Sequence, residues 1–280
     1  RLNGRVEAQE RSLALAGYRD SRPVRVGNGA AGQTQLDVYG EVLDAASELA
    51  RSAGALDRDH ARRLAGIADH VCTVWRERDA GIWEVRSAAA HFTQSKMMCA
   101  VALDRACTLA GQGHLRGNVA RWQHERERVR DFVETRCYSE RKRSYTRSAD
   151  EELLDASLLL GLIGRFGDGR SPRWLGTVDA VRRELASGPL VRRYLSGDGL
   201  PGEEGAFLAC SFWLAEAYAR QGRLEEAAEL MDELVGLAND VGLYAEEVDP
   251  STGEFLGNFP QGLSHLALIN AAVAVAGAGR

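Results

Sequence analysis

The stretch Ala206-Phe-Leu-Ala-Cys-Ser-Phe-Trp-Leu214 is apolar on almost every side of a helix, and it is followed by an amphipathic stretch, Leu224 to Leu237. In the second stretch, apolar side chains recur at helical spacing and acidic side chains cover the opposite face. The apolar positions are Leu224, Ala227, Leu230, Met231, Leu234 and Leu237, and the acidic ones are Glu225, Glu226, Glu229, Asp232 and Glu233. A helix without a polar face is buried on every side, whereas a helix with one polar face lies at the surface. The two stretches therefore predict a hairpin of one inner and one outer helix.

The same pairing recurs along the whole chain. The runs Met97 to Leu109, Leu153 to Ile163 and Leu263 to Val275 also have too few polar residues for a face toward water. Buried helices are expected to begin near Thr34, Phe92, Asp150, Gly205 and Phe259, with separations of 58, 58, 55 and 54 residues. A more polar helix fits into each separation, which predicts a helical-hairpin repeat with a period in the mid-fifties. Proline is scarce and alternating valine-rich runs are nearly absent, so the chain is predicted to be all-α.

Helices that are apolar all round must close around a common centre, because an open solenoid would leave one face of its inner layer in water. The repeat therefore predicts an α/α toroid, with residues 1–33 leading into a barrel formed by residues 34–280. A tetratricopeptide-like scaffold is the alternative, and Gly222-Arg-Leu-Glu-Glu-Ala227 has that local pattern. Its period of 34 residues fits the observed spacing poorly.

Composition and charge exclude several classes of function. The net charge of -5 and the pI near 5.8 give no sign of a nucleic-acid partner, and the basic stretch Arg136 to Arg147 is interrupted, as in a solvated loop. No run of 18 apolar residues and no signal peptide is found, so no membrane segment is expected. Five cysteines without CxxC and six histidines without HExxH indicate a reducing, cytoplasmic location and no metal site.

The loops that lead into the predicted inner helices are long and should all open on one end of the ring. They are residues 22–33, 79–91, 139–149, 192–204 and 244–261, and they hold much of the Trp, Tyr, Arg and Glu outside helices. The opposite connections, such as 52–55 and 111–113, are short and consist of small residues. Because binding residues concentrate on loops held by a rigid scaffold, one end of the ring is predicted to be functional.

Two acidic stretches, Gly81-Ile-Trp-Glu84 and Tyr244-Ala-Glu-Glu247, lie on this functional end. Paired carboxylates that face a common pocket are the minimal equipment for breaking a glycosidic bond. A loop glutamate is normally just solvated, but Trp83 is costly to leave in water and fits better as the floor of a pocket. Its apolar face would raise the pKa of the Glu84 carboxyl, as a general acid requires.

Arg193 and Tyr194 reach the same end from the fourth loop. Two interpretations remain open for Arg193 at this point. It is either an ordinary surface residue or a fixed fork of N–H donors for sugar hydroxyls.

At these residues the chain closely resembles the bacterial branch of glycoside hydrolase family 15, which groups glucoamylases, α,α-trehalases, glucodextranases and related exo-glucosidases. The matching segments run in order from about residue 17 to the C-terminus, so the resemblance is specific. They are Ser21-Arg-Pro-Val-Arg-Val-Gly-Asn28, Leu36-Asp-Val-Tyr-Gly-Glu41, Gly81-Ile-Trp-Glu-Val-Arg86, His91-Phe-Thr93, Ser95-Lys96, Val101-Ala-Leu-Asp-Arg-Ala106, Asp155-Ala-Ser157, Gly202 to Trp213, and Glu246 through Gly257-Asn-Phe-Pro-Gln261. The family's fold is an (α/α)6 barrel, which agrees with the hairpin repeat.

The resemblance implies a role for each candidate residue. Glu84 would be the general acid, and Glu246 the general base that activates water. The family acts with inversion, so the two carboxyls should lie roughly 6.5–9.5 Å apart. Arg193 looks like the arginine that holds the non-reducing glucose, Trp83 and Tyr194 line that subsite, and Glu247 is a supporting acid. This chemistry requires no cofactor.

The chain also departs from the family pattern. An earlier segment ending in Trp-Leu-Arg-Asp, whose Arg and Asp grip the terminal glucose, is missing, and so is the N-terminal β-sandwich of bacterial members. Only five of six inner helices can be counted and the chain begins at Arg1 without Met, so we expect a partial barrel that lacks its first hairpin. The usual Gly-Gly-Pro-like turn is Ser87-Ala-Ala-Ala90, and a usual tryptophan is Ala100. Starch-acting members often carry a second acid where this chain has Val85.

The sequence therefore predicts the catalytic portion of an inverting exo-α-glucosidase, with a small α-glucoside, foremost trehalose, as its substrate. A glucoamylase or an isomaltose- or dextran-type glucohydrolase is the alternative within the family. A toroid that binds a saccharide without cutting it is the alternative of another class, supported by the missing Arg-Asp segment and the altered turn. Whether the protein is a homo-oligomer is left open.

Overall fold

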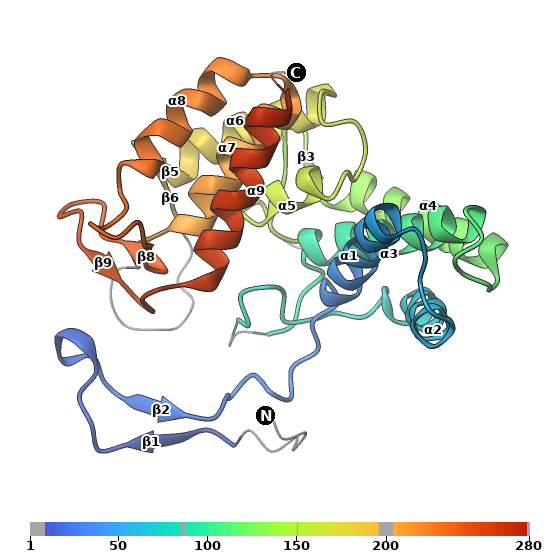
Figure 1. Cartoon of the computed structure of the whole chain (residues 1–280), viewed down its shortest axis with the longest axis horizontal. Coiled ribbons are helices and arrows are strands. Elements are labelled where there is room, and N and C mark those ends of the chain that lie inside the picture. The colour runs from blue at the N-terminus through green and yellow to red at the C-terminus, as the bar shows by residue number, and fades with distance from the viewer. Residues whose placement is uncertain (1–8, 86–87, 150, 196–203, 279–280) are drawn as a thin grey trace.

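Helices alternate with long loops through the computed structural model, which describes residues 9–85, 88–149, 151–195 and 204–278 (Figure 1). The α-helices of these residues are α1 (Val38–Ala53), α2 (Arg58–Val74), α3 (Thr93–Gly111), α4 (Val119–Arg136), α5 (Leu158–Ile163), α6 (Pro172–Leu185), α7 (Leu208–Gln221), α8 (Leu224–Val235) and α9 (Gly262–Ala278). Figure 1 shows α1 to α4 on one side and α6 to α9 on the other, with α5 between them. Consecutive helices form hairpins, as the repeat predicts.

The predicted distinction between inner and outer helices is confirmed in the two best-formed hairpins. Nearly every side chain of α7 is buried, and so is the first half of α3, while α8 buries only one face. The buried residues of α8 are Ala227, Leu230, Met231 and Leu234, which are four of the six predicted apolar positions. Helix α3 begins one residue after the expected start, and α1, α7 and α9 begin within four residues of theirs. Hydrophobic periodicity thus predicts the first residues of these helices to within four positions.

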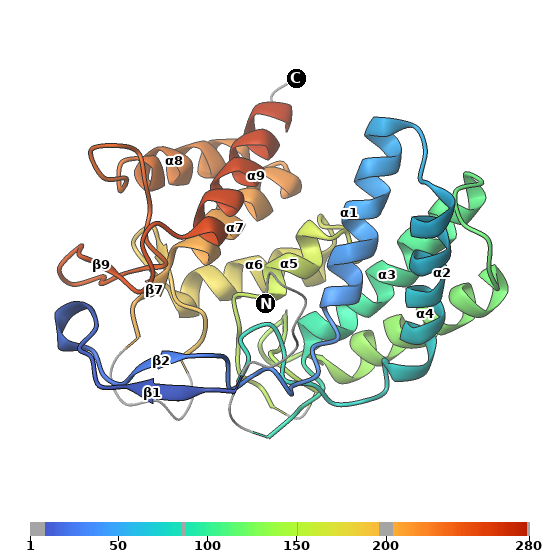
Figure 2. The same cartoon turned by 60° about the horizontal axis from the view of Figure 1, so that its bottom comes forward.

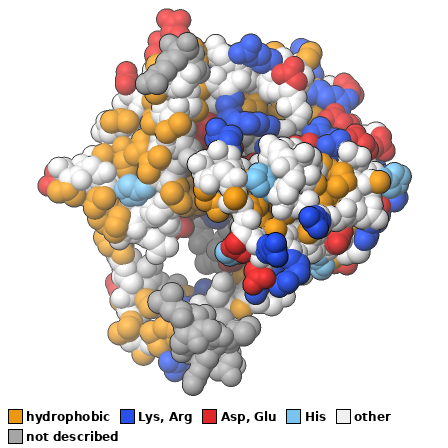
Figure 3. All heavy atoms as spheres, turned by 45° about the vertical axis from the view of Figure 1, so that its right-hand side comes forward, with side chains coloured by type: hydrophobic (Ala, Val, Ile, Leu, Met, Phe, Trp, Pro, Cys, Tyr) orange, Lys and Arg blue, Asp and Glu red, His pale blue; other side chains and the backbone are white. Residues whose placement is uncertain are grey.

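The last inner helix departs from the prediction that its apolar run is buried on every side. On α9, Leu266, Ile269 and Val273 are 60, 55 and 67% exposed. The helices α1 and α9 are the first and last of the arc, and they face each other across a cavity of about 730 Å³ (Figure 2). Figure 3 shows hydrophobic side chains gathered on this side of the molecule. The apolar face is exposed because no described helix packs against it, as expected of an open ring.

The third inner helix is shorter than its apolar run. Helix α5 begins at Leu158, although the run from Leu153 predicts a helix there, and the expected start at Asp150 lies outside the described residues. The Asp155 carboxylate accepts a hydrogen bond from the backbone N–H of Ser157 at 2.8 Å. Such a bond gives the backbone an alternative to the helix and favours a turn. A polar turn therefore replaces the first residues of the predicted helix.

Short strands hold the loops in place without forming a large sheet. They are β1 (Arg11–Leu13), β2 (Val24–Val26), β3 (Tyr138–Ser139), β4 (Ser144–Tyr145), β5 (Ala186–Ser187), β6 (Leu190–Val191), β7 (Ala206–Phe207), β8 (Glu247–Val248) and β9 (Phe255–Leu256). One such unit is the β1–β2 hairpin, in which Arg11 is the partner of Val26, and Figure 2 shows it at the end of the molecule where α1 and α9 begin. The other important unit is the three-stranded sheet β7-β8-β9, in which Phe207 is the partner of Glu247. Both units lie at the end that the loop lengths mark as functional.

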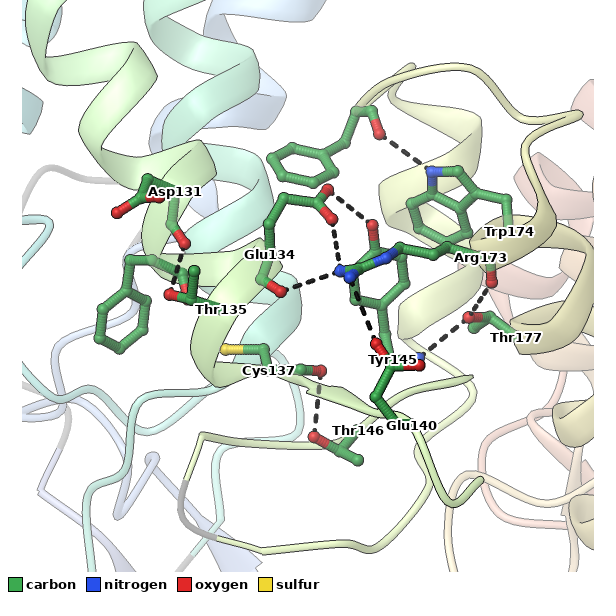
Figure 4. Close-up of polar contacts among 12 residues, drawn as sticks. Asp131, Glu134, Thr135, Cys137, Glu140, Tyr145, Thr146, Arg173, Trp174 and Thr177 are labelled. Carbon is green, nitrogen blue, oxygen red and sulfur yellow. Dashed lines mark hydrogen bonds and ion pairs between the residues drawn. The ribbon is translucent and has the colours of Figure 1, made fainter. Parts of the chain in front are cut away.

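A polar cluster joins the second and third hairpins (Figure 4). Glu134 of α4 accepts hydrogen bonds from the Tyr145 hydroxyl at 2.7 Å and from Arg173 of α6 at 2.7 Å. The Tyr145 backbone N–H donates to Thr177 Oγ1 at 3.0 Å, and the Tyr145 ring packs on Trp174 with ring centroids 4.9 Å apart. Figure 4 shows Arg173 and Tyr145 converging on Glu134. The outer helices of neighbouring hairpins are thus held together by Arg173 directly and by the buried Tyr145 between them.

The connections at the opposite end are tight. Helix α1 is followed directly by Gly54, which has φ of 79°, and α7 by Gly222, which has φ of 81°. Glycine adopts this left-handed conformation at little cost and is common just after a helix. These turns reverse the chain within a few residues, as the short small-residue connections predict.

In residues 9–85, 88–149, 151–195 and 204–278, no helix is both long and apolar enough to cross a membrane. The same residues contain no group of three or more His, Cys, Asp and Glu side chains arranged to hold a metal ion. All five cysteines are free thiols.

Candidate active site

The loop that carries Glu84 is closed at its base by Asp79. The backbones of Asp79 and Ala90 exchange two hydrogen bonds, at 3.0 and 3.1 Å. The buried Asp79 Oδ2 accepts hydrogen bonds from the Ser95 hydroxyl at 2.7 Å and from the backbone N–H groups of Leu36 at 3.1 Å and Gly81 at 3.3 Å. One carboxylate thus ties the loop to the segment before α1 and to the first turn of α3.

Glu84 itself has an unusual backbone and an open side chain. Its φ is 51°, in the left-handed region that costs non-glycine residues energy and often marks functional positions. Its Oε1 accepts a hydrogen bond from Gln35 Nε2 at 3.3 Å, and Gln33 Nε2 donates to the neighbouring Val85 carbonyl at 3.0 Å. The Glu84 side chain is exposed, so the described residues do not form the apolar enclosure that Trp83 was expected to provide.

Trp83 lies in a cluster of aromatic side chains and one arginine. Its indole N–H donates to Asp155, with distances of 2.9 and 3.0 Å to the two carboxylate oxygens. Its ring packs on Phe207 at 5.4 Å and on Trp213 at 6.0 Å between centroids. Trp83 therefore does fill a partly buried site, as expected of a loop tryptophan, but its contacts are with the turn before α5, with β7 and with α7.

Arg193 faces this same cluster and is fixed there. Its guanidinium carbon lies 5.2 Å from the Trp83 ring centroid and 5.4 Å from that of Phe207. It forms an ion pair with Glu204, and its backbone carbonyl accepts a hydrogen bond from the Ala156 N–H at 2.8 Å. Tyr194 beside it is buried, with its ring under Arg147 at 4.8 Å. The Arg193 guanidinium is thus mostly buried and held by Glu204, Trp83 and Phe207.

Glu246 is held on one side only. Its Oε2 accepts hydrogen bonds from the backbone N–H of Asn258 at 3.0 Å and from Asn258 Nδ2 at 2.8 Å. Gly257 has φ of 70°, and a Cβ atom there would lie 2.8 Å from the same Oε2. Glycine is therefore required beside this carboxylate. With Oε2 anchored, Oε1 is the oxygen left to act on another molecule.

Glu247 is the first residue of β8 and binds a different partner from Glu246, which precedes the strand. Its Oε2 accepts a hydrogen bond at 3.2 Å from the N–H of Gly205, the residue just before β7. Glu247 thus supports the β7–β8 pairing from inside the site.

The loops of Glu84 and Glu246 meet through Phe207. Trp83, next to Glu84, packs on the Phe207 ring, and Glu247, next to Glu246, is the strand partner of Phe207. Arg193 lies over the rings of both Trp83 and Tyr194. Glu84 and Glu246 are linked to this cluster through the residues next to them, Trp83 and Glu247. Phe207 was not singled out from the sequence, since within an apolar run it looks like any core residue.

Several partners of the site were also missed from the sequence. Gln35, Asn258 and Asp155 each bind a candidate residue, and all three are polar residues within or next to the segments that carry the family resemblance. Their position in those segments was the only available signal. Which side chain each one would bind depends on loop geometry that spacing does not encode.

The helices form an arc of hairpins with inner and outer members, and the long loops gather at one end. This architecture is that of the α/α toroid class of proteins. The sequence profile described as glycosyl hydrolases family 15 matches residues 2–273. The chain belongs to this family, and the predicted all-α toroid is thereby confirmed.

Relatives and solved structures agree with this membership. The chain is 42% identical to a trehalase of Mycolicibacterium smegmatis, over 95% of this chain and 41% of that protein. It is 36% identical to a trehalase of Thermoplasma acidophilum, over 94% of this chain and 45% of that protein. The chain thus spans about two fifths of the length of the curated relatives it matches.

Among solved structures, a wild-type glycosidase superposes with a TM-score of 0.76 at 18% identity, over 94% of this chain and 74% of that one. A bacterial glucoamylase complexed with acarbose gives a TM-score of 0.70 at 17% identity, over 86% of this chain and 41% of that one. At these low sequence identities, the two structures show similarity of fold alone.

Proposed function

We propose that the chain carries the catalytic barrel of an inverting exo-α-glucosidase whose substrate is trehalose. The observation that carries this proposal is the junction at Phe207, which joins the loop of Glu84 to the loop of Glu246 beside Arg193. The similarity to two proteins named trehalase supports trehalose over larger glucans. Val85, where starch-acting members often have a second acid, points the same way.

In the proposed reaction, the Glu84 carboxyl donates its proton to the glycosidic oxygen as the bond from that oxygen to the anomeric carbon breaks. Glu246 takes a proton from a water molecule, and the water oxygen bonds to the anomeric carbon from the opposite face. One glucose leaves with the protonated oxygen, and the other is released as the β-anomer. The carboxyl separation that such a water needs is roughly 6.5–9.5 Å.

The surroundings of Glu246 support its role as the base. A carboxylate with one oxygen bound by two N–H donors keeps a fixed orientation, and the second oxygen can accept a proton from water. Because Asn258 donates to Oε2 only, it holds the carboxylate in place without covering Oε1.

Arg193 and Trp83 are proposed to bind the terminal glucose. The guanidinium supplies a rigid set of donors for hydroxyl oxygens, and the indole supplies an apolar face for the sugar ring. The ion pair with Glu204 fixes the position of Arg193 before the substrate arrives. Glu247 is proposed to keep β7 and β8 together beneath this subsite.

The test compares Glu84→Gln and Glu246→Gln with the unchanged protein, each in the full length that its gene encodes. Glucose release is measured on trehalose, maltose, isomaltose and soluble starch, and the anomer is assigned by NMR. Each variant should lose at least about 100-fold in kcat while its far-UV spectrum stays the same. Glu229→Gln is the matched control, since Glu229 is exposed on the outer helix α8.

Three results would contradict the proposal in different ways. Normal turnover by either Gln variant would remove the assigned acid or base. Inverting hydrolysis of trehalose gives one α-glucose and one β-glucose, so release of α-glucose alone would exclude inversion. Sugar binding by calorimetry without any product from the unchanged protein would leave a saccharide-binding toroid as the function.

A further inference from the structure

Asp155 is a buried carboxylate to which the proposed reaction assigns no role. It is 2% exposed and lies in the turn before α5, where its Oδ1 also accepts the Ser157 N–H. Burial raises the pKa of this carboxyl, while the N–H donors of Ser157 and Trp83 act in the opposite direction. Since burying a carboxylate costs free energy unless it is well bonded, these contacts call for a reason beyond shaping a turn.

The turn at Asp155 holds residues from two other loops at once. The Asp155 carboxylate binds the indole N–H of Trp83, and the next residue, Ala156, donates its backbone N–H to the Arg193 carbonyl at 2.8 Å. Arg193 and Trp83 in turn face each other at 5.2 Å. The relative position of the arginine and the indole is therefore set from a single turn.

A carboxylate is a suitable partner for this purpose. A hydrogen bond to an ionised acceptor is roughly twice as strong as one between neutral groups. With both oxygens within 3.0 Å of Nε1, the Trp83 ring is held in one orientation about its side-chain bonds. Arg147 lies on the other side of the carboxylate, with its Nε 3.9 Å from Oδ2, and balances the buried charge.

We infer that Asp155 is a positioning residue of the sugar subsite, which acts through the indole N–H of Trp83 and contacts no substrate itself. The inference rests on the proposed function, because the readout is hydrolysis. It predicts that Asp155 matters to catalysis only while Trp83 has an N–H to hold.

A double-mutant cycle of Asp155→Asn and Trp83→Phe tests this prediction on the full-length protein with trehalose. Asn keeps the size of the side chain but turns an N–H₂ group toward the N–H donors, whereas Phe removes the indole donor. Misplacement of a binding group by about 1 Å can cost on the order of 100-fold, so D155N should lower kcat/KM by about 30-fold. In the W83F background the same change should lower kcat/KM by less than about threefold, since the shared interaction is already lost.

The matched control is a second Trp–Asp pair, in which the Trp122 indole donates to Asp69 Oδ1 at 2.8 Å between α4 and α2. D69N should lower the thermal midpoint and leave kcat/KM unchanged. Equal factors for D155N in both backgrounds would overturn the inference, and so would full activity of D155N. If D155N does not fold, Asp155→Ser enters the same cycle with the same two criteria. If the unchanged protein releases no glucose, the proposed function fails, which is a separate outcome.

Discussion

At the scale of single residues, the proposed base depends on Asn258, which supplies two of the hydrogen bonds to one carboxylate oxygen. Asn258→Ala removes the side-chain donor and leaves the backbone donor. We expect kcat on trehalose to fall about tenfold, which corresponds to about 1.4 kcal/mol, because Glu246 loses its fixed orientation. Steady-state kinetics check this value, with Asn239→Ala in the loop after α8 as the control. An unchanged kcat would mean that Asn258 does not orient the base.

Asp37 makes the stability of the protein depend on pH. Burial, with the nearby Asp79 as the second cause, raises the pKa of Asp37 to about 6 from 3.8. Between these values the folded state binds more protons than the unfolded state, so the free energy of unfolding falls as pH rises from about 4 to about 6. The loss should be about 3 kcal/mol at most.

The variant Asp37→Asn removes this titration. Urea unfolding at pH 4, 5, 6 and 7 should show D37N gaining on the unchanged protein as pH rises, with the difference constant above about pH 6.5. The opposite trend, in which D37N loses ground as pH rises, would contradict the direction of the pKa shift.

At the scale of elements, Glu134 joins two hairpins through Tyr145 and Arg173. Glu134→Ala would leave the buried Tyr145 hydroxyl without its acceptor, so we expect a loss of about 1–3 kcal/mol in the free energy of unfolding. Glu140→Ala is the matched control: Glu140 is 84% exposed and lies 3.5 Å from the same arginine. Its loss should stay below about 1 kcal/mol. Urea denaturation of both variants gives the comparison, and equal losses would contradict the role of Tyr145.

Element by element, the sequence predicts helices best where periodicity alone decides them. The run of α7 and the striped pattern of α8 lead to the observed hairpin almost residue for residue. For α5 the apolar run is misleading, because the Asp155 side chain competes for the backbone before Leu158. Local hydrogen bonds of this kind are invisible to a count of apolar positions.

The residues of the candidate site, like the helices, can be predicted from the sequence only in part. Trp83, Arg193 and Tyr194 do meet, as their shared end of the ring indicates. The sequence does not predict the contacts at Phe207 or the hydrogen bonds of Gln35, Asn258 and Asp155, because these depend on how the loops fold. The expected enclosure of Glu84 is not found among the described residues, since Trp83 packs against α7 and binds Asp155 in the turn before α5.

At the scale of the whole molecule, the open side of the arc exposes an apolar stripe on α9. Exposed apolar patches of this kind promote association. The 280-residue chain expressed alone should therefore self-associate as its concentration rises, and Leu266→Gln, Ile269→Gln and Val273→Gln together should reduce this. Sedimentation velocity over a concentration series checks the expectation. A chain that stays monomeric without the substitutions would contradict it.

The glycine turns at the end opposite the long loops have a practical consequence. A Cβ atom at Gly54 or Gly113 would meet no other atom within 4 Å, so the chain reverses there in open space. Breaks in exposed turns of this kind are tolerated far better than breaks in packed segments. A cut at Gly113 would divide the polypeptide into two fragments, one with the loop of Glu84 and the other with the loop of Glu246, whose reassembly would be needed before the proposed acid and base could act on one sugar.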